Sequence, residues 1–161
     1  MTEVPLTSLY QELILEHYRH PRNQGELAQP TAEARVANPV CGDELSVQIR
    51  LDGERIEDIA FDGHGCSISQ ASMSMMTDLV KGSERNEAIR LADLFTDMMH
   101  GEGDSSDRSL GDLRAFEGVS KFPVRIRCAL LAFDALREAL SIGLDADQQP
   151  TNDGSERETT H

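Results

Sequence analysis

The sequence predicts an α+β domain in which helices cover one face of a small antiparallel sheet of three strands. Three observations predict this class: a strictly alternating segment at residues 44–51, an Asp-Gly turn directly after it, and helical periodicity on both sides of these strands. With 161 residues, the chain fits one domain of the usual ~150 residues.

The first helix is expected to begin at Ser8, because Ser8 and Gln11 form a capping-box pattern ahead of apolar residues at helical spacing. Pro21 ends this helix, since proline stops a helical run. A loop rich in proline and glycine follows at residues 21–33, and residues 34–37 are a short strand candidate.

The firmest local signal is a hairpin at residues 44–61. Apolar and polar residues alternate through 44–51, which is typical of a strand with one buried face. Asp52-Gly53 then forms the turn, and residues 55–61 return as the partner strand.

Helical periodicity returns after the hairpin. The expected helices run from Ser67 to a stop at Lys81-Gly82, from about Glu84 to Met99, briefly near Leu113 after a polar loop at 101–111, and from Pro123 to about Leu140. The Met73, Met75 and Met76 group is expected to fill the core, because methionine packs irregular interiors well.

Residues 1–144 are predicted to form the single domain, and residues 145–161 a disordered acidic tail. The tail has five acids, one arginine and no apolar residue beyond Ala146, so it cannot bury enough surface to offset its ordering entropy.

The net charge of −14 repels both phosphate backbones and anionic lipid headgroups, so neither nucleic acid nor membrane is expected as a partner. The longest apolar run, at residues 128–133, is far shorter than the ~20 residues that span a bilayer. The first ten residues carry no secretory pattern, and a cytoplasmic location is expected.

The chemistry is expected at the cysteines Cys41, Cys66 and Cys128. An odd number of cysteines without an export signal favours reactive or metal-bound thiols over disulfides. Cys66 and Cys128 lie near predicted helix N-termini, where the helix dipole stabilises a thiolate. With Asp43, two residues after Cys41, these thiols would make a tetrahedral zinc site.

Each of these residues also has a plainer interpretation. Cys128 on an apolar stripe could be a small buried hydrophobe, and Cys66 could pack beneath a tight turn. Asp43 could be a turn former or a cap, and His64 is expected to be a solvated loop histidine rather than a ligand.

Three motifs, in this order, resemble the SufU family over roughly residues 6–142. The motifs are Asn38-Pro39-x-Cys41-Gly42-Asp43, the segment from Phe61 through Gly63, Gly65 and Cys66 to Thr77, and the segment from Gly118 through Phe122-Pro123 and Arg125 to Cys128-Ala129. SufU belongs to the U-type iron–sulfur scaffolds, with IscU and the N-terminal part of NifU. Two features favour SufU over IscU: Arg127 stands where IscU-like chains have a histidine, and a segment of about twenty residues is present at roughly 100–118.

The resemblance implies that Cys41, Asp43, Cys66 and Cys128 hold one Zn²⁺ ion and that Cys41 accepts sulfur. It implies a SufS-type cysteine desulfurase as partner, which would carry the pyridoxal phosphate, and downstream iron–sulfur assembly proteins. Arg125, one helical turn before Cys128, would steady a persulfide anion or the docking surface, or would simply be a solvated charge.

The resemblance therefore favours a cytoplasmic, zinc-dependent sulfurtransferase. The first alternative is a scaffold on which a [2Fe-2S] cluster is assembled and transferred, because the same thiolates serve both metals. The second is a non-catalytic module in which zinc only stabilises the fold.

Overall fold

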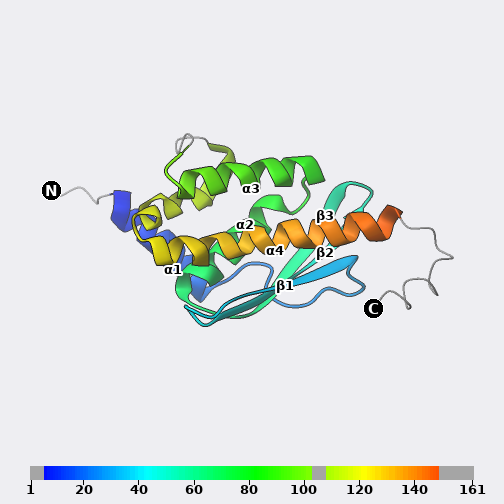
Figure 1. The fold of residues 1–161 in the computed structure, drawn as a ribbon, viewed down its shortest axis with the longest axis horizontal. Coiled ribbons are helices and arrows are strands. Elements are labelled where there is room, and N and C mark those ends of the chain that lie inside the picture. Colours follow the sequence, from blue (N-terminus) through cyan, green and yellow to red (C-terminus); the bar gives the residue numbers. More distant parts are fainter. Residues whose placement is uncertain (1–5, 103–107, 149–161) are drawn as a thin grey trace.

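The computed structural model describes residues 6–102 and 108–148. Its elements follow in the order α1 (Leu6–Arg19), β1 (Ala32–Asn38), β2 (Asp43–Asp52), β3 (Arg55–His64), α2 (Ser67–Val80), α3 (Arg85–Met99), the 3-10 segment η1 (Arg108–Lys121) and α4 (Pro123–Gln148). This order, with three antiparallel strands and helices over one side of them, confirms the predicted α+β class (Figure 1).

The sheet has the order β1-β2-β3, and both pairs are antiparallel. Asp52 pairs with Arg55 across a two-residue turn, where Gly53 adopts a φ of +63° that favours glycine. The β1-β2 turn is longer by two residues, because Asn38 pairs with Asp43 and leaves residues 39–42 outside the ladder. Both strands that flank β2 are longer than the sequence predicted.

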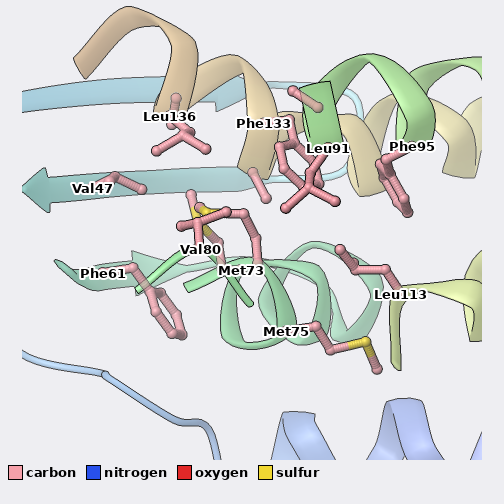
Figure 2. Close-up of a cluster of buried hydrophobic side chains, with 14 of the residues drawn as sticks. Val47, Phe61, Met73, Met75, Val80, Leu91, Phe95, Leu113, Phe133 and Leu136 are labelled. Carbon is pink, nitrogen blue, oxygen red and sulfur yellow. The ribbon is translucent and has the colours of Figure 1, made fainter. Parts of the chain in front are cut away.

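The helices lie on the buried face of the sheet. α4 packs along β1 and β2, α2 packs on β3, α1 packs on α2, and α3 packs on α4 and η1 (Figure 1). The core between these layers contains the alternating aliphatic residues of β2 and the predicted methionine group, and an aromatic cluster forms where α3, η1 and α4 meet (Figure 2). In this cluster the Phe95 ring centroid lies 5.9 Å from that of Phe116 and 5.2 Å from that of Phe133.

Two predicted helix boundaries are wrong. α1 begins at Leu6, so Ser8 lies inside the helix and does not cap it. α4 continues past Leu140 to Gln148, so it includes the first residues that were assigned to the tail. The rest of the predicted acidic tail, residues 149–161, lies outside the described residues.

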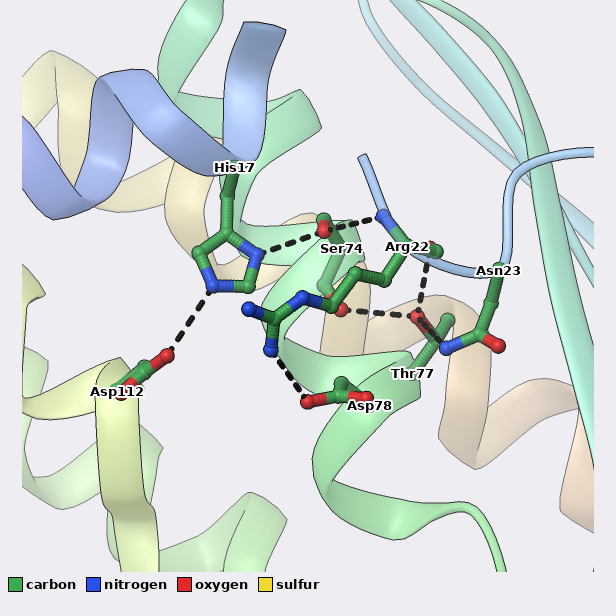
Figure 3. A network of polar contacts seen from close by, with 7 residues as sticks. All are labelled: His17, Arg22, Asn23, Ser74, Thr77, Asp78 and Asp112. Carbon is green, nitrogen blue, oxygen red and sulfur yellow. Dashed lines mark hydrogen bonds and ion pairs between the residues drawn. The ribbon is translucent and has the colours of Figure 1, made fainter. Parts of the chain in front are cut away.

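A buried polar network joins α1 to α2 and η1 (Figure 3). His17 is 1% exposed, and its Nδ1 lies 2.7 Å from Ser74 Oγ while its Nε2 lies 3.2 Å from Asp112 Oδ2. The backbone N–H of Arg22 also donates to Ser74 Oγ, at 2.8 Å. Because the buried side chains of His17 and Ser74 have these partners, they fix α1 and the loop after it against α2, while Asp112, whose side chain is 46% exposed, ends the network at the surface.

Within residues 6–102 and 108–148, no helix combines the length and the hydropathy that crossing a bilayer requires.

Candidate metal centre

The β1-β2 turn presents Cys41 and Asp43 at one end of the sheet. The carbonyl of Asn38 accepts the N–H of Cys41 at 3.2 Å, and the carbonyl of Pro39 accepts the N–H of Gly42 at 3.3 Å. Gly42 has a φ of +71°, a conformation that side chains disfavour. The turn thus places Cys41 at its tip and Asp43 on the first position of β2.

Cys66 is the N-cap of α2, in agreement with its predicted position directly before this helix. Its backbone N–H donates to Asp43 Oδ1 at 2.8 Å, and its Sγ accepts the N–H of Ser69 at 3.4 Å. Gly63 carries the chain close to β2: its φ is +120°, and a Cβ there would meet the carbonyl oxygen of Glu44 and lie 2.8 Å from Leu45 Cα. The strand-to-helix connection therefore brings the helix N-terminus against Asp43.

Cys128 approaches the same point from the second turn of α4. It is fully buried, and its Sγ lies 2.7 Å from Cys41 Sγ and 3.7 Å from Asn38 Nδ2, which donates to it. Ligand atoms of Cys41, Asp43 and Cys128 all lie within 4.8 Å of one another. The structure thus brings three of the four predicted ligands into one mutual group, and Cys66 adjoins it through its hydrogen bond to Asp43.

Asp43 has the features of a metal ligand. The residue is 2% exposed, and its Oδ1 accepts two hydrogen bonds, from the Cys66 N–H at 2.8 Å and from Ser69 Oγ at 2.9 Å. Its Oδ2 is buried without a hydrogen-bond partner in the described part of the chain. A buried carboxylate oxygen without a partner is costly, and a cation at this position would satisfy it. The donor set of thiols and one carboxylate fits zinc, which takes Cys and Asp ligands in four-coordinate sites.

The electrostatics of the group follow from its burial. The pKa of Cys128 is raised above the ordinary thiol value, first by burial, then by its hydrogen bond to Cys41 and the charge of Cys66. The pKa of exposed Arg125 is also raised, first by the thiolate charge of Cys66 and less strongly by those of Cys128 and Cys41, which stabilise its charged form. Arg125 therefore lies within electrostatic reach of all three sulfur atoms.

Of two other predictions about side chains, one is confirmed in part and one in full. His64 is exposed, as expected, but it is the last residue of β3 rather than a loop residue, and its Nε2 lies 3.5 Å from Glu44 Oε1. The three methionines of α2 are buried in the core.

Three residues that arrange the predicted ligands were not predicted as site residues from the sequence: Asn38, Gly65 and Ser69. Ser69 stands three residues after Cys66, the spacing at which an N-cap side chain meets a backbone N–H, and this spacing could have identified the pair. Gly65 has no comparable signal, because the need for it arises only from Asp43 and Ser69, which a Cβ at this position would meet at 2.5 Å.

The model of the NifU-like N-terminal domain family matches residues 9–140. The zinc-dependent sulfurtransferase SufU of Bacillus subtilis is 43% identical over 136 residues, which cover 84% of this chain and 92% of that protein. The iron–sulfur cluster assembly scaffold protein IscU of Streptococcus pyogenes is 43% identical over 141 residues, 88% of each chain. Among solved structures, an N-terminal NifU-like protein from Brucella abortus superposes with a TM-score of 0.79 at 27% identity, over 87% of this chain and 97% of that one.

Proposed function

The chain belongs to the NifU-like N-terminal domain family, and on that premise we propose that it is a zinc-dependent sulfurtransferase. It would accept persulfide sulfur from a SufS-type cysteine desulfurase and pass it on to iron–sulfur cluster assembly proteins. The observation that carries the proposal is the group of Cys41, Asp43 and Cys128. In it a buried carboxylate oxygen that has no hydrogen-bond partner among the described residues lies close to one thiol from the same turn and one from α4.

In this proposal Cys41, Asp43, Cys66 and Cys128 bind the zinc ion. Bound zinc would hold the cysteine sulfurs as thiolates at neutral pH, which the burial of Cys128 otherwise opposes. Asn38 and Ser69 support the ligands by donating N–H groups to the sulfurs of Cys128 and Cys66. Such outer hydrogen bonds fix the orientation of metal ligands.

Cys41 is the sulfur acceptor in this proposal, and its position supports that role. Among the described residues, the sulfurs of Cys66 and Cys128 each receive an N–H donor, whereas the only hydrogen-bond contact of Cys41 Sγ is the thiol of Cys128. Cys41 also lies on a turn of four residues rather than in a helix. It is thus the ligand that can leave with the smallest disturbance of the fold.

The transfer itself is a thiol–persulfide exchange. The thiolate of Cys41 attacks the outer sulfur of the persulfide on the desulfurase cysteine, and a new S–S bond forms on Cys41. The S–S bond of the donor persulfide breaks, and the desulfurase cysteine leaves as a thiolate. Arg125, which lies within reach of the thiolate charges, would steady the anionic persulfide or an acidic group of the docked partner.

The surface around Cys41 supports docking of a protein donor. Val40 is 77% exposed directly before Cys41, and Phe122 and Val124 are exposed at the start of α4. Exposed large apolar residues that gather beside a site often mark a protein interface. We propose a cytoplasmic location, because three cysteines without a disulfide, one of which accepts sulfur, need a reducing compartment.

The decisive experiment measures desulfurase turnover with the purified protein and with Cys41→Ala. Wild-type protein with about one zinc per chain is expected to stimulate turnover, and Cys41→Ala is expected to fold but not to stimulate. Glu33→Ala, at an exposed position of β1 outside both the turn and the apolar docking surface, is the control and is expected to stimulate normally. Normal stimulation by Cys41→Ala would contradict the proposal.

A second candidate is a scaffold for a [2Fe-2S] cluster, because a relative of equal identity carries the name of a scaffold protein. Anaerobic reconstitution with iron and sulfide, followed by transfer to an apo-ferredoxin, separates the two functions. Transfer that is faster than free assembly, together with weak stimulation of the desulfurase, would favour the scaffold.

A module in which zinc is only structural is tested separately. If zinc were only structural, a folded Asp43→Ala variant would keep normal sulfur transfer.

A further inference from the structure

Ser69 contacts two of the proposed ligands at once. The residue is fully buried in the first turn of α2, and its Oγ donates to Asp43 Oδ1 at 2.9 Å. Its backbone N–H donates to Cys66 Sγ at 3.4 Å, and its Oγ also lies 3.1 Å from the Cys66 carbonyl oxygen. The hydroxyl has one proton, which favours the carboxylate because bonds to charged acceptors are the stronger ones.

This arrangement determines which oxygen of Asp43 is available. Oδ1 is occupied by Ser69 Oγ and by the N–H of Cys66, so the carboxylate cannot offer both oxygens to one ion. Oδ2, buried and without a partner in the described part of the chain, remains as the ligand atom. The absence of a Cβ at Gly65 makes room for this contact, since a Cβ there would lie 2.5 Å from both Asp43 Oδ1 and Ser69 Oγ.

The network also distinguishes Cys41 from the other ligands. Ser69 connects Asp43 and Cys66, and Asn38 donates to Cys128, whereas no hydrogen bond joins Cys41 to Ser69. When Cys41 leaves to take sulfur, three ligands remain, and two of these three are held in place by Ser69.

We propose that Ser69 is a positioning residue of the metal centre: it fixes Asp43 and Cys66 relative to each other, so that zinc stays bound when Cys41 is released. The proposal deepens the proposed function and rests on it for the release of Cys41. Its test requires neither the desulfurase nor sulfur, so a failure of sulfur transfer and a failure of positioning give different results.

The experiment measures zinc affinity by competition with a chromophoric chelator under anaerobic, reducing conditions. Ser69→Ala and the control Ser72→Ala are compared in the wild-type background and in Cys41→Ala. Ser72 is an equally buried serine of α2 whose hydroxyl donates to the Ala129 carbonyl at 2.7 Å, so its removal reproduces the loss of a buried hydrogen bond that involves neither Asp43 nor Cys66.

Ser69→Ala is expected to weaken zinc binding about 10-fold with Cys41 present and toward about 100-fold in Cys41→Ala, the range found when outer partners of metal ligands are removed. Ser72→Ala is expected to leave the affinity unchanged in both backgrounds. The absorption bands of bound Co²⁺ provide a second readout, and they should change in Ser69→Ala but not in Ser72→Ala. Ser69→Thr keeps the hydroxyl and is expected to retain zinc, which makes the test independent of how well Ser69→Ala folds.

Three results would overturn the proposal: equal zinc affinity in wild type and Ser69→Ala, equal losses in Ser69→Ala and Ser72→Ala, or a loss in Ser69→Ala that is the same with and without Cys41. The first two would remove the positioning role, and the third would remove its link to the release of Cys41.

Discussion

Gly65→Ala places one methyl group between the two residues that orient the metal centre. The added Cβ would lie 2.5 Å from Asp43 Oδ1 and 2.5 Å from Ser69 Oγ, which is 0.9 Å short of the 3.4 Å where ordinary contact begins. Both atoms must therefore move, and they cannot separate without losing or stretching their own hydrogen bond of 2.9 Å.

The displacement is large on the scale of metal coordination. Ligand distances in a zinc site hold to within about 0.2 Å, so a shift of several tenths of an ångström in the carboxylate removes or weakens its bond. We expect Gly65→Ala to lower zinc affinity by about 10- to 100-fold, the usual cost of disturbing the residues around a ligand, or about 1.4–2.8 kcal/mol.

Chelator competition on the purified variant measures this loss, with Gly118→Ala as the matched control. A Cβ at Gly118 meets nothing within 4 Å, and its φ lies outside the range that only glycine favours, so the same chemical change should leave the affinity as it is. Zinc affinity of Gly65→Ala within twofold of wild type would refute the geometry assigned to Asp43 and Ser69.

Two predictions concern the fold that carries the site. Phe95→Ala removes a fully buried ring from the aromatic cluster and should lower the free energy of unfolding, measured with denaturant, by about 3–5 kcal/mol. The control Phe122→Ala removes an exposed ring and should lower it by less than about 0.5 kcal/mol. Similar losses in both variants would contradict the assigned core. Ser74→Ala leaves His17 Nδ1 without its partner and should lower the free energy of unfolding by about 1–3 kcal/mol. The control Ser120→Ala removes an exposed hydrogen bond and should lower it by less. Equal losses of stability in thermal unfolding would contradict the role of the network.

The sequence predicts the hairpin well because its signal is local. Alternation through β2 and an Asp-Gly turn are enough to specify two strands, the turn and the buried face of β2, but not the shift in register between Arg50 and Leu51. Helix ends are less predictable: Ser8 has the residue type of a cap, yet the helix begins before it at Leu6, since other residues can satisfy a helix terminus.

The candidate site also has a part that local sequence patterns predict and a part that they do not. The three cysteines and Asp43 are visible in the sequence as thiols in turns and near helix starts, but their spacing leaves a metal site and plain packing equally open. What distinguishes the two is long-range: Ser69 lies 26 positions from Asp43, and Asn38 lies 90 positions from Cys128. Such contacts arise from the packing of α2 and α4 against the sheet, and no local pattern specifies them.

The buried histidine is a further example. Nothing local in the sequence distinguishes His17 from the other residues of an amphipathic helix. Its partner Asp112 is 95 positions away, in η1. Its interior position follows from tertiary packing, which overrides any residue-level expectation for histidine.

The most direct test of the account locates the transferred sulfur. Zinc-loaded protein is mixed with a SufS-type desulfurase and cysteine, its thiols are alkylated, and the peptides that contain Cys41, Cys66 and Cys128 are analysed by mass spectrometry while zinc is quantified in the same sample. We expect one additional sulfur atom on Cys41 alone, with zinc still bound by the remaining ligands. Sulfur on Cys66 or Cys128 instead, or unmodified cysteines beside an active desulfurase, would contradict it.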